Sequence, residues 1–177
     1  NHVVIFDTVS KRYSACGARL GCLITKNAEL YQVALKFAQA RLSPPAVAQI
    51  AATAAVDTPQ SYFDEVLEEY TERRDVLVAG LNALPGVFCP NPGGAFYVVA
   101  RFPIDNSDKF CQWMLESFEY ENETVMMAPA AGFYSSADAG QDEVRLAYVL
   151  HTDELKKALV CLEKALAAYP GRTTTSA

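Results

Sequence analysis

Apolar residues in the first third of the chain form short runs and longer helical patterns. The runs at 2–6 and 20–25 are rich in β-branched residues and predict two strands buried in a sheet. The stretch 28–39 has helical composition, and a Ser-Pro-Pro break at 43–45 ends it. The stretch 46–56 is mostly alanine and other apolar residues, so we expect a helix that is packed on most of its faces.

A long amphipathic pattern follows over residues 60–84 and predicts one helix. Its apolar face carries Tyr62, Val66, Leu67, Tyr70, Leu77 and Leu81. After Pro85 the pattern predicts strands at 94–100, 124–128 and 143–150 and helices at 107–120 and 152–169. Thr152, followed by two acidic residues, is the expected N-cap of the last helix.

These elements predict an α/β chain with a domain boundary near Pro59. Residues 1–58 have the pattern of an incomplete piece of a larger sheet. Residues 59–177 have the pattern of a compact two-layer α+β domain attached to the long helix. We expect only this second part to hold a core of its own.

Composition narrows the classes of function. The chain has 177 residues, 51% of them hydrophobic and 20% charged, which is typical of a globular protein. A net charge of -6 argues against nucleic-acid binding, and no apolar run reaches the roughly 18 residues that a membrane span needs. The five cysteines form no Cys-x-x-Cys pair and do not cluster with the two histidines, so we expect reduced thiols in a cytoplasmic protein without a zinc site.

Lys11 stands among residue types that could bind a phosphate group. Thr8 and Ser10 supply hydroxyls, Gly17 lets a ligand approach the backbone, and Arg19 adds a fixed cation. A lysine amine beside a phosphate-bearing aldehyde is what Schiff-base chemistry requires. These residues alone leave a solvated surface lysine as the alternative.

The run from residue 10 to residue 21 reads Ser-Lys-Arg-Tyr-Ser-Ala-Cys-Gly-Ala-Arg-Leu-Gly. It resembles the cofactor-lysine motif of the class I/II aminotransferases of fold type I, S-K-x-[FY]-x-x-x-G-x-R-[LVI]-G, at every fixed position. The resemblance implies that Lys11 carries pyridoxal 5'-phosphate as a Schiff base and moves a proton between the substrate Cα and the cofactor. It also implies that Thr8 and Arg19, assisted by Ser10, bind the cofactor phosphate.

Three later segments extend the resemblance. Residues 92–97 are similar to the family's P-x-G-A-F-Y strand near the substrate, and residues 128–133 to its P-G-x-x-F loop without the usual glycine. Residues 144–148 are similar to the V-R-[LI]-[SA]-[FY] strand, which implies that Arg145 binds the substrate α-carboxylate. An arginine in an apolar strand is costly to bury without an anion, and its planar guanidinium suits a carboxylate. A strand-end arginine that reaches solvent is the alternative.

Arg41 lies just before Ser43-Pro44-Pro45, which resembles the family's S-N-P-P stretch. In aspartate-specific members an arginine of the partner subunit near this stretch binds the distal carboxylate of the substrate. That arginine aligns near Ala38, so Arg41 would be a substitute for it and would imply an acidic substrate. A cation that stabilises the C-terminus of a helix is an equally good interpretation.

In this family the cofactor lysine lies well past the middle of the chain, and here it is residue 11. We therefore expect a C-terminal fragment, in which 1–58 is a truncated remnant of the large cofactor-binding domain with the lysine loop and 59–177 is the small C-terminal domain. The aspartate that keeps the pyridine nitrogen protonated belongs to the missing part, so we expect the fragment alone to be inactive. We expect residues 1–58 either to pack on a partner chain or to be poorly supported.

The resemblance is strongest to bacterial-type aspartate aminotransferases. It implies a homodimeric enzyme that moves an amino group between an amino acid, aspartate or another acidic one, and a 2-oxo acid, with no membrane or nucleic-acid partner. Two alternatives stay open. One is related chemistry on the same scaffold, a C–S β-lyase or an aminocyclopropane-carboxylate synthase; the other is a non-catalytic module for dimerisation or partner binding.

Overall fold

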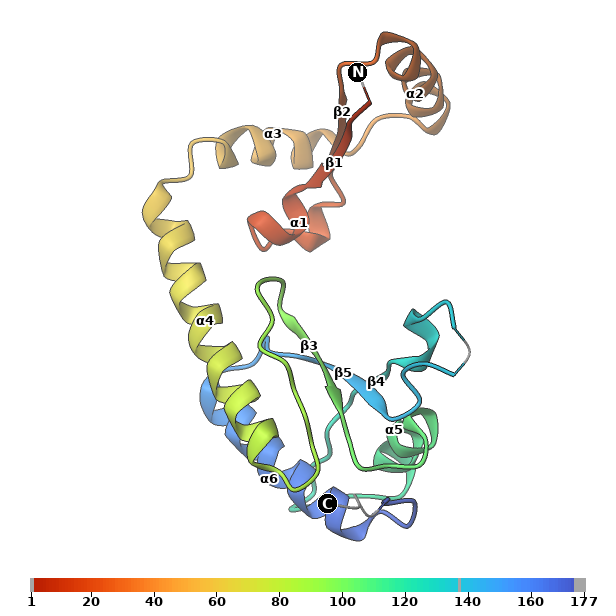
Figure 1. Cartoon of the computed structure of the whole chain (residues 1–177). Helices are drawn as coiled ribbons and strands as arrows, with labels where there is room; N and C mark the ends of the chain where they lie inside the picture. Colours follow the sequence, from red (N-terminus) through yellow and green to blue (C-terminus); the bar gives the residue numbers. More distant parts are fainter. Residues whose placement is uncertain (1, 137, 174–177) are drawn as a thin grey trace. The chain divides into compact units, whose positions relative to one another are not determined.

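The computed structural model describes residues 2–136 and 138–173 (Figure 1). The chain divides into two compact units, Asn1–Tyr62 and Phe63–Ala177. Each unit is described by itself below. Within the described residues, no helix combines the length and the apolar character that crossing a lipid bilayer would require.

In the first unit, two antiparallel strands enclose the lysine segment. Strand β1 (Val4–Thr8) pairs with β2 (Gly21–Thr25). The segment between them, expected to be a loop, contains one turn of helix, α1 (Val9–Arg12), and a 3₁₀ turn, η1 (Cys16–Ala18). The helical turn forms because the side chain of Thr8 caps it, a local hydrogen bond that the apolar pattern does not reveal.

Gly21 is required where the two strands meet α1. The register places Thr8 opposite Gly21, at the end of the ladder. A Cβ at Gly21 would lie 2.8 Å from the backbone oxygen of Asp7, closer than any side chain tolerates. The absence of a side chain at residue 21 therefore lets β2 approach β1 directly beside the lysine turn.

Helix α2 (Ala28–Arg41) begins at Asn27, whose side chain accepts a hydrogen bond from the backbone N–H of Leu30 at 3.0 Å. Helix α3 (Ala46–Ala55) follows Pro45. The prediction that α3 is packed on most faces is wrong for this chain, since Val47 is 79% exposed and Ile50 72%.

The two strands are also less buried than their apolar sequence predicts. Their residues are half-buried or exposed, and Phe6 is 77% exposed. Among residues 2–62, no side chain reaches the buried class. The first unit is held by backbone ladders and caps rather than by a core.

The second unit is an antiparallel sheet with three helices. Its elements are α4 (Gln60–Ala83, which begins just before the division), β3 (Tyr97–Arg101), α5 (Ser107–Glu116), β4 (Ala128–Pro129), the 3₁₀ turn η2 (Ala131–Phe133), β5 (Glu143–Ala147) and α6 (Thr152–Ala168). The strand order is β3-β5-β4, so β5 is central. Segments far apart in the sequence therefore meet at β5 (Figure 1).

The second unit has a continuous core. It includes Leu77 and Leu81 of α4, Val98 of β3, Phe110 and Met114 of α5, Val144 and Leu146 of β5, and Leu162 and Leu166 of α6. Helices α4 and α6 touch at Gly80, where a Cβ would lie 2.1 Å from the Leu159 side chain. Leu67, predicted for the same apolar face of α4, is 68% exposed.

Several predicted boundaries in the second unit are wrong for local reasons. Strand β3 begins at Tyr97 rather than 94, because Ala95 has a positive φ of 62°. Helix α5 ends at Glu116 rather than 120, and a turn with positive φ at Glu121 and Asn122 follows.

The later boundaries differ as well. Strand β4 is only Ala128–Pro129, while Thr124 in the predicted strand donates a hydrogen bond to the backbone oxygen of Met114. Strand β5 ends at Ala147 rather than at residue 150. Thr152 is the first residue of α6 rather than its N-cap, which is His151.

Candidate active site

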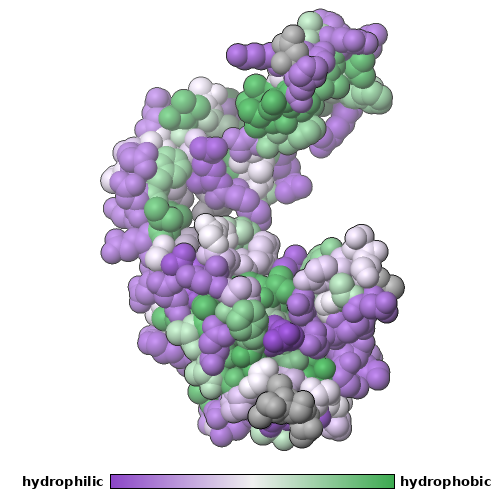
Figure 2. Space-filling view, viewed as in Figure 1, coloured by the Kyte–Doolittle hydropathy of each residue, from purple (hydrophilic) through white to green (hydrophobic). Residues whose placement is uncertain are grey.

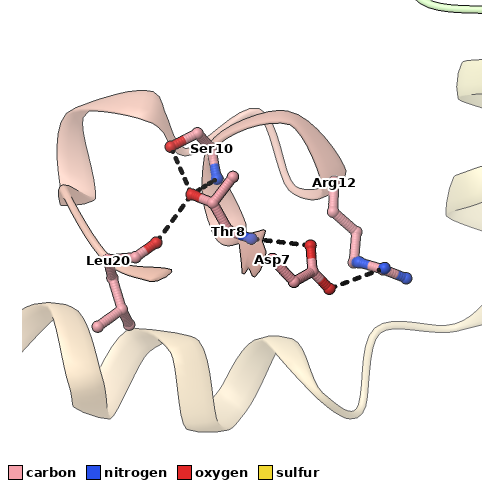
Figure 3. Close-up of polar contacts among 5 residues, drawn as sticks. All are labelled: Asp7, Thr8, Ser10, Arg12 and Leu20. Atoms are coloured by element: carbon pink, nitrogen blue, oxygen red, sulfur yellow. Dashed lines mark hydrogen bonds and ion pairs between the residues drawn. The ribbon is translucent and has the colours of Figure 1, made fainter. Parts of the chain in front are cut away.

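The hydroxyl of Thr8 is the centre of a local hydrogen-bond network (Figure 3). It donates to the backbone oxygen of Leu20 at 2.9 Å and accepts from the backbone N–H of Ser10 at 3.2 Å. The Ser10 hydroxyl lies 2.9 Å from it. A threonine hydroxyl has one proton, so with that proton directed at Leu20 the serine hydroxyl donates to Thr8.

This network brings the two ends of the lysine segment together. Leu20 also accepts a hydrogen bond from the backbone N–H of Val9 at 3.3 Å. Thr8 and Ser10 are thereby tied to the residue that follows Arg19. Lys11 lies on the same helical turn and is exposed.

Arg19 has an unusual backbone conformation. It follows the 3₁₀ turn with φ 53° and ψ 40°, in the left-handed region. Its guanidinium donates to the backbone oxygen of Cys16 at 3.0 Å, and the side chain is exposed. This bond leaves most of the five N–H donors of the guanidinium available to a ligand.

The donors of this segment fit a phosphate-bearing aldehyde. Two hydroxyls, a guanidinium and a lysine amine lie within one turn-and-strand unit. A Cβ placed at Gly17 would meet nothing within 4 Å, so a ligand can approach the backbone there. These donors are of the kinds that bind a phosphate group and form a Schiff base with an aldehyde.

Sequence reasoning missed one ion pair beside this network. Arg12 contacts the carboxylate of Asp7 at 3.1 Å, and Asp7 also accepts from the backbone N–H of Thr8 at 2.7 Å (Figure 3). Both charged side chains are about half exposed, so the pair contributes little stability. The five-residue separation of the two charges gives no recognisable motif in the sequence.

Sequence reasoning also missed a groove of about 460 Å³ in the first unit. It is lined by residues of β1, α1 and β2 together with residues of α3, among them Thr8, Arg12, Tyr13, Ala52, Thr53 and Val56. Thr8 is the only predicted site residue among those that line it. The apolar pattern of α3 could not reveal the groove, because the same pattern predicts a helix packed on most faces.

Arg145 lies in the middle of β5 and is half-buried. Its guanidinium carbon is 4.6 Å from the centre of the Tyr97 ring and 4.7 Å from that of Phe133. Among residues 2–136 and 138–173, no carboxylate forms an ion pair with it. The arginine is accommodated by aromatic faces, which leave its N–H edges for an anion.

Arg41 is the last residue of α2 and is exposed. Within the described part of the chain it forms no ion pair. Its position suits a cation at the negative end of the helix dipole as well as a ligand-binding arginine.

The cysteines of the second unit are poor nucleophiles. Burial raises the pKa of Cys89 to about 11, and burial together with the nearby Asp108 raises the pKa of Cys111 to about 11. Burial also raises the pKa of Cys161. These thiols therefore stay protonated near neutral pH.

Comparison with known proteins identifies the family. Residues 1–162 match the family described as aminotransferase class I and II. The match covers most of the chain, and the chain belongs to this family. Members of the family use pyridoxal 5'-phosphate, in agreement with the donors around Lys11.

Individual relatives support the same family and fold. An aspartate aminotransferase of Rhizobium meliloti is 33% identical over 163 residues, which cover 85% of this chain and 37% of the relative. A crystal structure of the aspartate aminotransferase from Rhizobium meliloti matches with a TM-score of 0.77 and 28% identity, over 93% of this chain and 42% of that one.

An alanine aminotransferase structure from Pyrococcus furiosus matches equally well, with a TM-score of 0.77 and 29% identity over 92% of this chain and 41% of that chain. The architecture is thus that of the fold type I enzymes. The chain spans about two fifths of the length of the relatives it matches.

Proposed function

We propose that this chain is part of a pyridoxal-phosphate-dependent aminotransferase that exchanges an amino group between an amino acid and a 2-oxo acid. The observation that carries the proposal is the network that joins Thr8, Ser10 and the segment after Arg19 around the turn that bears Lys11. The family membership supports the same chemistry.

Each residue of the lysine segment has a proposed role. The Thr8 and Ser10 hydroxyls and the Arg19 guanidinium bind the cofactor phosphate. Lys11 holds the cofactor through its amine and moves a proton at the substrate Cα. The cofactor, when bound, supplies a ring that withdraws electrons from that carbon.

Arg145 is proposed to bind the α-carboxylate of the substrate. Among the described residues it contacts two aromatic rings and no carboxylate pairs with it, so its N–H donors can pair with an anion. The bidentate geometry of guanidinium and carboxylate would orient the amino group of the substrate.

The amino acid is proposed to be aspartate or another acidic one, with Arg41 as the residue for the distal carboxylate. Support comes from the relatives named aspartate aminotransferase. A structure named alanine aminotransferase is just as similar. The test is the ratio of KM for aspartate to KM for alanine in the full-length enzyme, with and without Arg41→Gln. An unchanged ratio would assign Arg41 to the helix end only.

We also propose that the active enzyme is a homodimer and that the 177-residue chain alone does not turn over. The first unit exposes a set of large apolar side chains, among them Val3, Phe6, Phe37, Leu42, Val47, Ile50 and Val56 (Figure 2). Surfaces of this kind are normally covered in a functional protein. The chain also spans less than half of its matched relatives.

The test is to add pyridoxal 5'-phosphate to the chain, reduce with borohydride and map the modified lysines by mass spectrometry. We expect the modification to concentrate on Lys11 and to disappear from that peptide in Lys11→Ala. Lys26 is the matched control, because it is also exposed and directly follows β2 in the same unit. Equal labelling of Lys11 and Lys26 would contradict the proposed cofactor site.

A further inference from the structure

Two aromatic rings contact Arg145, one from each side of its strand β5. In the register of the sheet, Arg145 pairs with Val99 of β3 on one side and with Ala128 of β4 on the other. Tyr97 lies two residues before Val99 and therefore on the same face of the sheet. Phe133 belongs to η2, which directly follows β4.

Both rings are anchored by their own surroundings. The ring of Tyr97 packs on that of Phe96, with centres 4.3 Å apart. The preceding residue, Ala95, accepts a hydrogen bond at 2.8 Å from the hydroxyl of Tyr148, which is buried. On the other side, the backbone N–H of Phe133 bonds to the oxygen of the buried Ala130 at 2.9 Å.

One carboxylate on the same strand face as Arg145 has a hydrogen-bond partner of its own. Glu143 lies two residues before Arg145, so the strand period places both on one face. Its carboxylate accepts a hydrogen bond from the hydroxyl of Tyr134. This hydrogen bond raises the pKa of Tyr134 above its ordinary value. Among the described residues, Glu143 forms no ion pair with Arg145.

We propose that Tyr97 and Phe133 are positioning residues that hold the Arg145 guanidinium by its faces and present its N–H edge to a carboxylate. This inference rests on the proposed function, in which Arg145 binds the substrate. An arginine on a flexible stem loses side-chain entropy when it binds an anion. Rings that restrict it beforehand reduce that loss and so tighten binding.

The experiment measures how succinate protects Arg145 from phenylglyoxal, with each modified arginine quantified by mass spectrometry. Arg101 is the internal reference, because it lies on the adjacent strand β3 and its guanidinium carbon is 5.8 Å from the Phe88 ring. In the unsubstituted chain we expect succinate to protect Arg145 and to leave the modification rate of Arg101 unchanged.

The variants replace each ring by leucine, an apolar side chain without a ring. We expect Tyr97→Leu and Phe133→Leu each to raise the succinate concentration for half-protection about twofold to fivefold, the size of one partly exposed cation–π contact. Tyr97→Phe and Phe133→Tyr keep a ring and should behave as the unsubstituted chain. Phe88→Leu is the matched control: Phe88 and Phe133 are 55% and 58% exposed, and only Phe133 faces Arg145.

Each outcome has a distinct meaning. If the leucine variants keep the unsubstituted half-protection concentration, the rings do not position Arg145 and the inference is overturned. If Phe88→Leu weakens protection as much as Phe133→Leu, the effect is a general loss of structure, which also overturns it. If succinate fails to protect Arg145 in the unsubstituted chain, the assigned role of Arg145 in the proposed function is wrong, whatever the lysine-labelling test shows.

Discussion

The two units are built from equally apolar sequence, yet only one of them has a core. Helix α3 of the first unit is mostly alanine, valine and isoleucine and leaves Val47 and Ile50 largely exposed. Helix α6 of the second unit alternates charged and apolar residues and buries Leu155, Leu162 and Leu166. Apolar content predicts that a surface will be buried, but it does not predict which segment of chain buries it.

The difference has an energetic consequence. Full burial of a leucine stabilises a fold by about 1.5 to 3 kcal/mol, and the second unit gains this at many positions. The described residues of the first unit gain only partial burial, with caps and strand hydrogen bonds that are worth about 1 kcal/mol each. The second unit should therefore be much the more stable of the two.

The largest effect is expected from the core itself. Leu81 of α4 is fully buried, and Leu81→Ala should lower the free energy of unfolding of the second unit by about 2 to 5 kcal/mol. Urea unfolding followed by the fluorescence of Trp113, the single tryptophan, reports on this unit. Leu67→Ala on the same helix is the control and should change the value by less than about 0.5 kcal/mol. Equal losses in the two variants would show that α4 buries a different face.

Hydrogen exchange compares the two units directly. Backbone amides of β5 should exchange at least about 100-fold more slowly than those of β2, because only β5 opens against a packed core. The measurement is exchange in the isolated chain, followed by mass spectrometry or NMR. Equal protection of the two strands would mean that the apolar surface of the first unit is covered in solution.

The smallest effect concerns polar contacts. Burial raises the pKa of Tyr169 to about 12, and its hydrogen bond to Asp105 adds to the shift. A raised pKa means that this stabilisation is complete below the unfolded value near 10 and is lost as the pH rises towards 12. Between these values the unsubstituted chain should lose about 1 to 2 kcal/mol more stability than Tyr169→Phe.

Urea unfolding followed by Trp113 fluorescence across this pH range measures the difference. If the free energy of unfolding has the same pH dependence in the unsubstituted chain and in Tyr169→Phe, the hydrogen bond to Asp105 does not have the assigned role. The counterpart in the first unit is Arg12→Ala, which removes the exposed ion pair with Asp7 and should change the stability of that unit by less than about 1 kcal/mol. Hydrogen exchange of the β1 and β2 amides measures this change.

The elements of the fold were predictable where a pattern acts locally. The order of strands and helices, and the long helix α4 almost to its ends, follow from apolar spacing and proline breaks. The apolar pattern did not predict element boundaries that are set by a backbone torsion angle or by a side-chain cap. Ala95 delays β3 by its positive φ, and Thr8 turns the expected loop into a helical turn.

The candidate site divides in the same way. The motif around Lys11 predicted which residues form the candidate site. It could not predict the hydrogen bond from the Thr8 hydroxyl to the backbone oxygen of Leu20, twelve residues later. Arg145 was predicted from the resemblance of residues 144–148 to a family strand, while the contacts of Phe133 and Tyr134 were not predicted. Their roles depend on the pairing of β4 with β5, which is a tertiary property.

The left-handed backbone of Arg19 implies a compromise between durability and chemistry. A side chain in this conformation costs on the order of 1 kcal/mol relative to glycine, which adopts it freely. Replacement by glycine would relax the turn and remove the guanidinium at the fixed arginine position of the motif. An arginine at this position therefore lowers the stability of the fold slightly but keeps a positive charge where the backbone conformation favours glycine.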